Sequence, residues 1–227
     1  CNERAKLRLK QLGELTSNIH IIGSPDVDVM TSGKLPTLDD VRDRYNIPFK
    51  DYGIFMYHPV TTDLINLPTN IKHSIDAILN SDDNYVVIYP NNDHGSNVII
   101  NELERLKENP KFKVFPSIRF EYFLTLLKES KYIIGNSSAG IREAPFYGIP
   151  TINLGNRQSG RSSACSIMNI REDKEEILTS IKSSTTSNFT PLQEFGEGNS
   201  DERFIEAIST IHFWNTEKQK VFIDTVD

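Results

Sequence analysis

Six short apolar runs alternate with helix-like segments along the chain, and this order restricts the possible folds more than any other feature. Between the runs, apolar residues recur every three or four positions, which is typical of amphipathic helices. Short apolar strands that alternate with helices favour a parallel sheet covered on both faces. We therefore predict an α/β fold with a doubly wound, Rossmann-like parallel sheet. The expected strands are Gly53–Tyr57, Tyr85–Tyr89, Phe112–Phe115, Tyr132–Gly135, Thr151–Leu154 and Ser166–Ile170, and the expected helical faces are Ile71–Leu79, Val98–Leu106 and Phe120–Leu127.

The composition narrows the class of protein. The chain has 227 residues, of which 37% are hydrophobic, and a net charge of −6. This is enough apolar material for a large core, and the acidic balance argues against nucleic-acid binding. No apolar run reaches the roughly 18 residues of a membrane span. The two cysteines, Cys1 and Cys165, fit neither a disulfide framework nor a metal site, so we expect a reducing, cytoplasmic location without a metal or cofactor.

The first residues predict a segment that belongs to another domain. Glu3–Leu12 has the pattern of a helix that ends at Gly13, and Asn18–Gly23 has the pattern of a strand. We expect residues 1–28 to be the tail of a preceding domain, and residues 29–213 to form the sheet domain. Residues 214–227 are expected to form a helix that returns to the preceding domain. The alternative is a processed N-terminus on a complete protein.

Polar residues follow each of the first five expected strands. In an open parallel sheet, ligands bind outside the carboxyl ends of the strands, so these residues are expected to meet at one rim. Polar loops are common, and the pattern alone is moderate support for a binding site. In chain order, the polar groups are His58-Pro59, Asn91–His94, Pro116-Ser117, Asn136–Gly140 and Asn156–Gln158.

The turn after the fourth strand predicts a phosphate site. Small residues let the backbone approach a phosphate closely, and the hydroxyls of Ser137 and Ser138 add donors. The alternative is an ordinary turn that is capped by serine. Simple capping does not explain Glu143, because Gly140 and Ile141 stand at the capping-box position after the two serines. A carboxylate there is able to accept hydrogen bonds from a ribose diol.

Two arginines and a histidine complete the candidate set. Arg157 and Arg161 lie in a Gly/Ser-rich loop, where they are either solvated or form a mobile clamp on a diphosphate. His58 is either structural or a donor or general acid/base. Asp93 and His94 have the same two interpretations.

Four segments resemble the C-terminal half of the hydrolysing UDP-N-acetylglucosamine 2-epimerases, in family order and with family-like spacing. Together they span most of the chain after residue 50. The long block is highly specific, whereas the last segment is weak alone. The segments are His58–Thr62, Tyr89–Ser96, Gly135–Arg161 and Gly196–Asn199.

The resemblance implies a two-domain GT-B architecture, of which this chain carries the C-terminal, UDP-binding domain. It implies that Ser137, Ser138, Ala139 and Gly140 hold the diphosphate, that Glu143 binds ribose, and that the backbone near Phe115 meets uracil. The same resemblance places His58, Asn91, Asp93, Arg157 and Arg161 on the phosphate and sugar side, with His58 and Arg157 as the catalytic candidates.

The reaction that the resemblance implies is elimination of UDP from UDP-N-acetylglucosamine, followed by hydration to N-acetylmannosamine for sialic acid or related synthesis. His58-Pro59-Val60-Thr61 stands where non-hydrolysing relatives have a His-Arg type motif, which favours the hydrolysing branch. The family's catalytic carboxylates lie in the N-terminal half, so we expect this polypeptide alone to be inactive and the full-length protein to be a homo-oligomer. Two alternatives remain: a GT-B glycosyltransferase that uses a UDP-sugar, and a catalytically silent UDP-sugar-binding protein.

Overall fold

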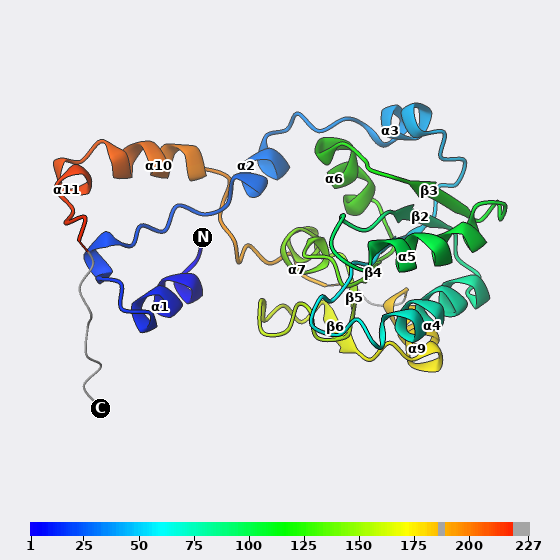
Figure 1. Cartoon of the computed structure of the whole chain (residues 1–227). Helices are drawn as coiled ribbons and strands as arrows, with labels where there is room; N and C mark the ends of the chain where they lie inside the picture. The colour runs from blue at the N-terminus through cyan, green and yellow to red at the C-terminus, as the bar shows by residue number, and fades with distance from the viewer. Residues whose placement is uncertain (186–188, 220–227) are drawn as a thin grey trace. The chain divides into compact units, whose positions relative to one another are not determined.

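The computed structural model describes residues 1–185 and 189–219 (Figure 1). The chain forms two compact units. One unit contains residues 35–192, and the other combines residues 1–34 with residues 193–227. These limits differ from the boundaries predicted at residues 28 and 213, and the assignment of the terminal segments to a preceding domain stays a prediction.

A parallel six-stranded sheet organises the larger unit, in the order β3-β2-β1-β4-β5-β6. The chain runs outward from β1 to β3, crosses back to β4 beside β1, and continues to β6, which is the doubly wound topology. All six predicted strands and the predicted fold class are confirmed. The strands are β1 (Gly53–Met56), β2 (Tyr85–Ile88), β3 (Phe112–Phe115), β4 (Ile133–Gly135), β5 (Thr151–Leu154) and β6 (Ile167–Ile170).

Helices cover both faces of this sheet (Figure 1). Helices α4 (Leu67–Asn80), α5 (Ser96–Leu103) and α9 (Lys174–Ser184) pack together on one face. The 3-10 helix η2 (Glu104–Leu106) extends α5. The other face carries α3 (Leu38–Tyr45), α6 (Phe120–Lys128), α7 (Ala139–Arg142) and α8 (Ala144–Tyr147). The three predicted helical faces are confirmed in α4, α5 with η2, and α6.

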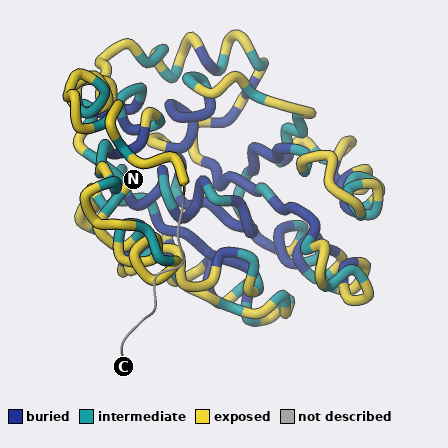
Figure 2. Tube along the Cα trace, turned by 60° about the vertical axis from the view of Figure 1, so that its left-hand side comes forward, coloured by how far each residue is buried: buried dark blue, intermediate teal, exposed yellow. Residues whose placement is uncertain are grey.

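Alternation along β1 assigns its side chains to the two faces. Phe55 and Tyr57 are buried in the core that also contains residues of α4, α5 and α9. Because successive side chains of a strand point to opposite faces, Met56 and His58 project toward the face of α6 and α7. The central strands are buried along their length, as the dark blue trace of Figure 2 shows. Tyr57 and His58, which directly follow β1, therefore lie at the same rim but on opposite faces of the sheet.

The smaller unit has helices but no sheet among its described residues. It contains α1 (Glu3–Gln11), the 3-10 helix η1 (Thr16–Asn18), α2 (Pro25–Thr31), α10 (Ser200–Ile208) and α11 (Ile211–Trp214). Asp28 in α2 accepts a hydrogen bond from the N–H of Ser200 at 3.0 Å, which joins the two segments. The helix expected over residues 3–12 is confirmed, and Gly13 follows it with a φ of +84°.

The strand predicted at residues 18–23 is wrong. These residues end η1 and continue in irregular backbone, because no neighbouring strand in the described part of this unit offers a ladder of hydrogen bonds. The helix predicted at residues 214–227 lies largely outside the described residues, and α11 ends at Trp214. In the ranges that the structure describes, no helix is long and apolar enough to cross a membrane.

Candidate functional site

The carboxyl ends of β1 and β4 lie side by side where the direction of winding reverses, with Met56 opposite Gly135. Gly135 ends β4 with a φ of +135°, and a Cβ atom there would lie 2.0 Å from the carbonyl oxygen of Met56. Only glycine fits this close approach. The next residue, Asn136, donates its backbone N–H to the same carbonyl at 3.2 Å. The polar residues that follow the two strands are therefore held side by side at the switch point, where doubly wound sheets bind ligands.

A cavity of about 420 Å³ opens beside this switch point on the α6 face, and we call it the Ser137 cavity. Its wall combines an apolar floor with polar groups from the ends of β1, β2 and β4. Such a mixture suits a ligand with a flat ring and a polar tail. The lining residues are Met56, His58, Ile88, Tyr89, Pro90, Asn91, Pro116, Ser117, Ile118, Phe120, Phe123, Ser137, Ser138, Ala139 and Glu143.

His58 is buried and has a fixed proton arrangement. Its Nδ1 accepts the backbone N–H of Asn91 at 3.1 Å, so the neutral ring carries its proton on Nε2. Burial, helped by the positive charge of Arg157, lowers the pKa of His58 to about 4, and the carboxylate of Asp93 opposes this. The imidazole is therefore neutral at pH 7. This favours the role of a neutral Nε2–H donor over that of a cationic acid.

The turn after β4 places two hydroxyls and a carboxylate in the cavity wall. Ser137 and Glu143 are 8% and 7% exposed. The Oγ atom of Ser137 accepts the N–H of Ala139 at 3.3 Å. Helix α7 has only four residues, so few peptide dipoles add up there, and the hydroxyls are the stronger donors. Glu143 lies at the junction between α7 and α8.

Gly140 has a packing role in this turn. A Cβ atom at this position would lie 2.6 Å from Cγ2 of Thr151 on β5. The hydroxyl of Thr151 also donates to the carbonyl oxygen of Gly140 at 2.6 Å. Because Gly140 has no side chain, α7 is able to pack against the sheet. The place of Gly140 among the ligand-binding residues stays a prediction.

The loop after β5 brings a cation to the same rim. Arg157 is half-buried and donates from Nη1 to the carbonyl oxygen of Asn136 at 3.1 Å. Burial lowers the pKa of Arg157, the carboxylate of Asp93 opposes this, and Arg161 adds to it. Arginine keeps its charge after such a shift, so the site holds a positive group beside His58. Arg161 is exposed and reaches this loop through Gln158, whose Oε1 accepts from its Nη1 at 2.8 Å.

The loop after β2 and the end of β3 form the remaining rim. The side chain of Asn91 donates to Oδ2 of Asp93 at 2.5 Å, and both residues are exposed. The carbonyl oxygen of Phe115 accepts the N–H of Tyr89 at 2.9 Å, and its ring packs edge-on against Tyr45. The backbone carbonyl of Phe115, near which uracil is expected, therefore already accepts a hydrogen bond within the sheet. The following residues, Pro116 and Ser117, line the cavity.

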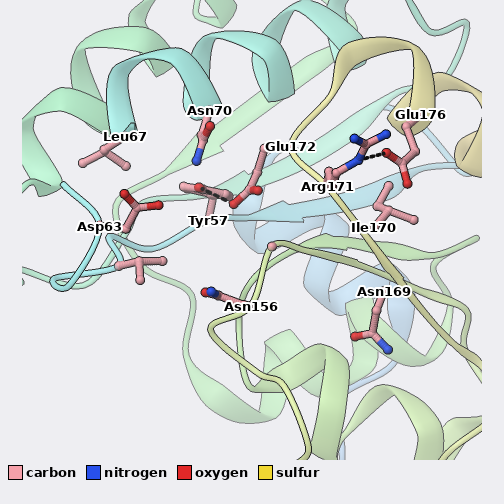
Figure 3. Close-up of a pocket in the computed structure, with 12 residues that line it drawn as sticks. Tyr57, Asp63, Leu67, Asn70, Asn156, Asn169, Ile170, Arg171, Glu172 and Glu176 are labelled. Atoms are coloured by element: carbon pink, nitrogen blue, oxygen red, sulfur yellow. Dashed lines mark hydrogen bonds and ion pairs between the residues drawn. The ribbon is translucent and has the colours of Figure 1, made fainter. Parts of the chain in front are cut away.

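A second cavity of about 380 Å³ lies at the same rim on the face of α4 and α9 (Figure 3). The hydroxyl of Tyr57 donates to Oε1 of Glu172 at 3.2 Å inside it. Arg171 pairs with Glu176 at 3.1 Å. Glu172 and Glu176 therefore already have protein partners. Among the described residues, no group of three or more His, Cys, Asp or Glu side chains is suited to hold a metal ion.

The structure brings most of the predicted site residues to one side of the sheet. His58, Asn91, Ser137, Ser138, Ala139 and Glu143 line the Ser137 cavity, whereas Phe115, Asp93, Gly140, Arg157 and Arg161 lie around it but not in its wall. The sequence prediction placed Asn136 and Gln158 among the polar groups after the strands but gave them no role in the site. Their buried side chains bind the site residues to one another. Their signal was the position of an amide in the loop after a strand: Asn136 directly follows β4, and Gln158 lies four residues after the end of β5.

Comparison with known proteins identifies the family. The family model described as UDP-N-acetylglucosamine 2-epimerase matches residues 1–209. The chain belongs to this epimerase family. A UDP-N-acetylglucosamine 2-epimerase of Neisseria meningitidis is 46% identical over 98% of the chain, which covers 60% of that relative. A UDP-N,N′-diacetylbacillosamine 2-epimerase (hydrolyzing) of Legionella pneumophila is 26% identical over 92% of the chain and 56% of that relative. The chain therefore spans less than two thirds of these curated relatives.

Solved structures of epimerases share the fold. The Methanocaldococcus jannaschii UDP-GlcNAc 2-epimerase, in complex with UDP-GlcNAc and UDP, superposes with a TM-score of 0.73 at 20% identity over 92% of this chain and 59% of that one. A Neisseria meningitidis UDP-GlcNAc 2-epimerase bound to UDP-GlcNAc gives a TM-score of 0.71 at 15% identity, over 91% and 59% of the two chains. At these identities the likeness supports the GT-B epimerase fold alone.

Proposed function

We propose that this epimerase-family chain binds the UDP part of a UDP-sugar in the Ser137 cavity. One observation carries the proposal: His58, Ser137, Ser138 and Glu143 converge on one cavity at the switch point, and Arg157 lies beside it. A pyrophosphate needs donors and positive charge, which the serines, His58 and Arg157 supply. A uracil ring suits the apolar floor, and a ribose diol suits a carboxylate. In this proposal, the chain binds UDP without a metal or cofactor.

We further propose the hydrolysing reaction for the protein that carries this chain. Removal of the C2 proton and cleavage of the C1–O bond release UDP and leave a 2-acetamidoglucal. Water then returns a proton to C2 from the opposite face and a hydroxyl to C1, which gives N-acetylmannosamine. His58-Pro59-Val60-Thr61 and the Arg157-Gln158-x-Gly160-Arg161 string support this branch. So does the hydrolyzing activity in the name of the Legionella relative.

Proton NMR of the reaction products tests this branch. When the protein that carries this chain is incubated with UDP-N-acetylglucosamine, we expect signals of free N-acetylmannosamine and of UDP to grow at equal rates. A mixture without protein serves as the control. Accumulation of an intact 2-epimerised UDP-sugar, with no free sugar, would contradict the hydrolysing assignment.

Glu143 is expected to select ribose over deoxyribose. A hydrogen bond to a charged carboxylate contributes about 1.5–3 kcal/mol, so UDP should bind about ten- to hundredfold more tightly than 2′-deoxy-UDP. Glu143→Gln removes the charge and one acceptor and should reduce this ratio. The matched control is Glu172→Gln in the second cavity, which should leave the ratio unchanged. Calorimetric titration measures both affinities. Equal binding of the two nucleotides by the unmodified chain would remove Glu143 from the site.

A further inference from the structure

Asn136 joins the end of β4 to the end of β1 through its side chain. Its Oδ1 accepts the backbone N–H of His58 at 2.7 Å, and its Nδ2 donates to the carbonyl oxygen of His58 at 2.8 Å. Asn136 is 0% exposed. Both polar atoms of this buried amide thus bind the backbone of His58. They fix the position of the His58 backbone, from which the imidazole extends.

The backbone carbonyl of Asn136 joins the same point to the loop after β5. It accepts Nη1 of Arg157 at 3.1 Å and Nε2 of Gln158 at 2.9 Å, which uses both of its lone pairs. Gln158 is 2% exposed, and its Oε1 accepts Nη1 of Arg161 at 2.8 Å. One continuous set of hydrogen bonds therefore links His58 with both arginines.

This network orients the groups that face an anion. A guanidinium has five N–H donors in a rigid fork, so one bond to Asn136 fixes the direction of the others. His58 receives a second anchor from the N–H of Asn91, which sets Nε2 as its donor. Preorganised donors bind and stabilise charge better than donors that must be ordered when the ligand arrives.

We propose that Asn136 and Gln158 are positioning residues that hold His58, Arg157 and Arg161 for the diphosphate of the ligand. The inference rests on the proposed UDP site. Asn136 acts on His58 through its side chain and on Arg157 through its backbone, whereas Gln158 acts on Arg161. A side-chain substitution at Asn136 therefore releases His58 and leaves the acceptor of Arg157 in place.

The test compares Asn136→Ala and Gln158→Ala with a matched control, Asn153→Ala. Asn153 is a buried asparagine on the neighbouring strand β5, 1% exposed, and its amide donates to Asn169 at 2.8 Å outside this network. Two quantities are measured for each variant. Nitrogen-15 NMR reports the tautomer and pKa of His58 without nucleotide, and calorimetry gives the affinity for UDP.

Without the backbone anchor of Asn136, we expect the ring of His58 to move away from the N–H of Asn91 that sets its tautomer. Asn136→Ala should therefore give mixed tautomers of His58, raise the pKa of His58 toward its ordinary value, and weaken UDP binding about tenfold. Gln158→Ala should leave the tautomer unchanged and weaken UDP binding about threefold. Asn153→Ala should lower the unfolding temperature but change neither readout. If Asn136→Ala does not fold, Gln158→Ala still tests the inference through UDP affinity at an unchanged tautomer.

Unchanged UDP affinity in Gln158→Ala, or an unchanged His58 tautomer in a folded Asn136→Ala, would overturn the positioning role. Absence of UDP binding by the unmodified chain is a different result. It would overturn the proposed function, and with it the diphosphate as the ligand for which these groups are held.

Discussion

A Gly135→Ala variant is expected to lose about 4 kcal/mol or more of unfolding free energy, a large part of the roughly 5–15 kcal/mol that stabilises a typical folded domain. The added Cβ would lie 2.0 Å from the carbonyl oxygen of Met56. That carbonyl belongs to the neighbouring strand and is not free to move as a flexible side chain would be. The φ of +135° adds backbone strain for any residue with a side chain. Urea unfolding followed by circular dichroism measures the loss.

Gly33→Ala is the matched control for this substitution. Gly33 also has a positive φ, +68°, but a Cβ atom there would meet nothing within 4 Å. This change should therefore cost only about 1–2 kcal/mol for the left-handed backbone. Similar losses for the two variants would show that the close approach of β1 and β4 does not constrain the fold.

Arg157→Ala is expected to have the largest effect on the site. Loss of charge-assisted hydrogen bonds to a phosphate costs about 1.5–3 kcal/mol, which corresponds to a ten- to hundredfold weaker affinity for UDP. If Arg157 stabilises the charge that develops on the departing UDP, kcat of the full-length protein that carries this chain should fall by a larger factor than its KM rises. Calorimetry and steady-state kinetics separate these two quantities.

Two other arginine variants sharpen this prediction. Arg157→Lys should restore little, because an ammonium group lacks the planar fork that engages a carbonyl and a phosphate together. Arg161→Ala should have a smaller effect than Arg157→Ala, because Arg161 is exposed and reaches the site through Gln158. An Arg157→Ala variant that binds UDP as tightly as the unmodified chain would exclude Arg157 from the anion site.

The six strands of the larger unit could be predicted because their signals are local. A short apolar run such as Val86–Ile88 predicts a buried strand, and the alternation of such runs with helices predicts a parallel sheet. The run Asn18–Gly23 also contains three isoleucines but has no neighbouring strand in the described part of its unit. An apolar segment forms a strand only if another strand lies beside it. Residues far away in the sequence decide this, so the local pattern does not reveal it.

The predicted elements do not include α9, although its start signal is present. Asp173 caps this helix by accepting the N–H groups of Glu175 and Glu176 at 3.1 Å and 3.0 Å. An aspartate before acidic residues is a common N-terminal signal of helices. The helix could therefore have been predicted from its cap.

The candidate site could be predicted as a set of strand ends but not as a network. Sequence order assigns His58, Ser137 and Arg157 to three different strand ends, and topology brings these ends to one rim. The hydrogen bonds of Asn136 depend on the close approach of β1 and β4 that the missing side chain of Gly135 allows, and on the path of the loop after β5. Both are tertiary features, so nothing in the local sequence distinguishes Asn136 from an ordinary turn residue.

Titration of the nitrogen-15-labelled 227-residue chain with UDP, followed by amide NMR shifts, tests the central claim most directly. Two cavities open at the same rim on opposite faces of the sheet, and we assign UDP to only one of them, the Ser137 cavity. We expect saturable shifts at Asn91 and at residues 137–143, with Asn169 and Glu172 unaffected. Shifts that cluster at Asn169 and Glu172, or no shifts at millimolar UDP, would contradict it.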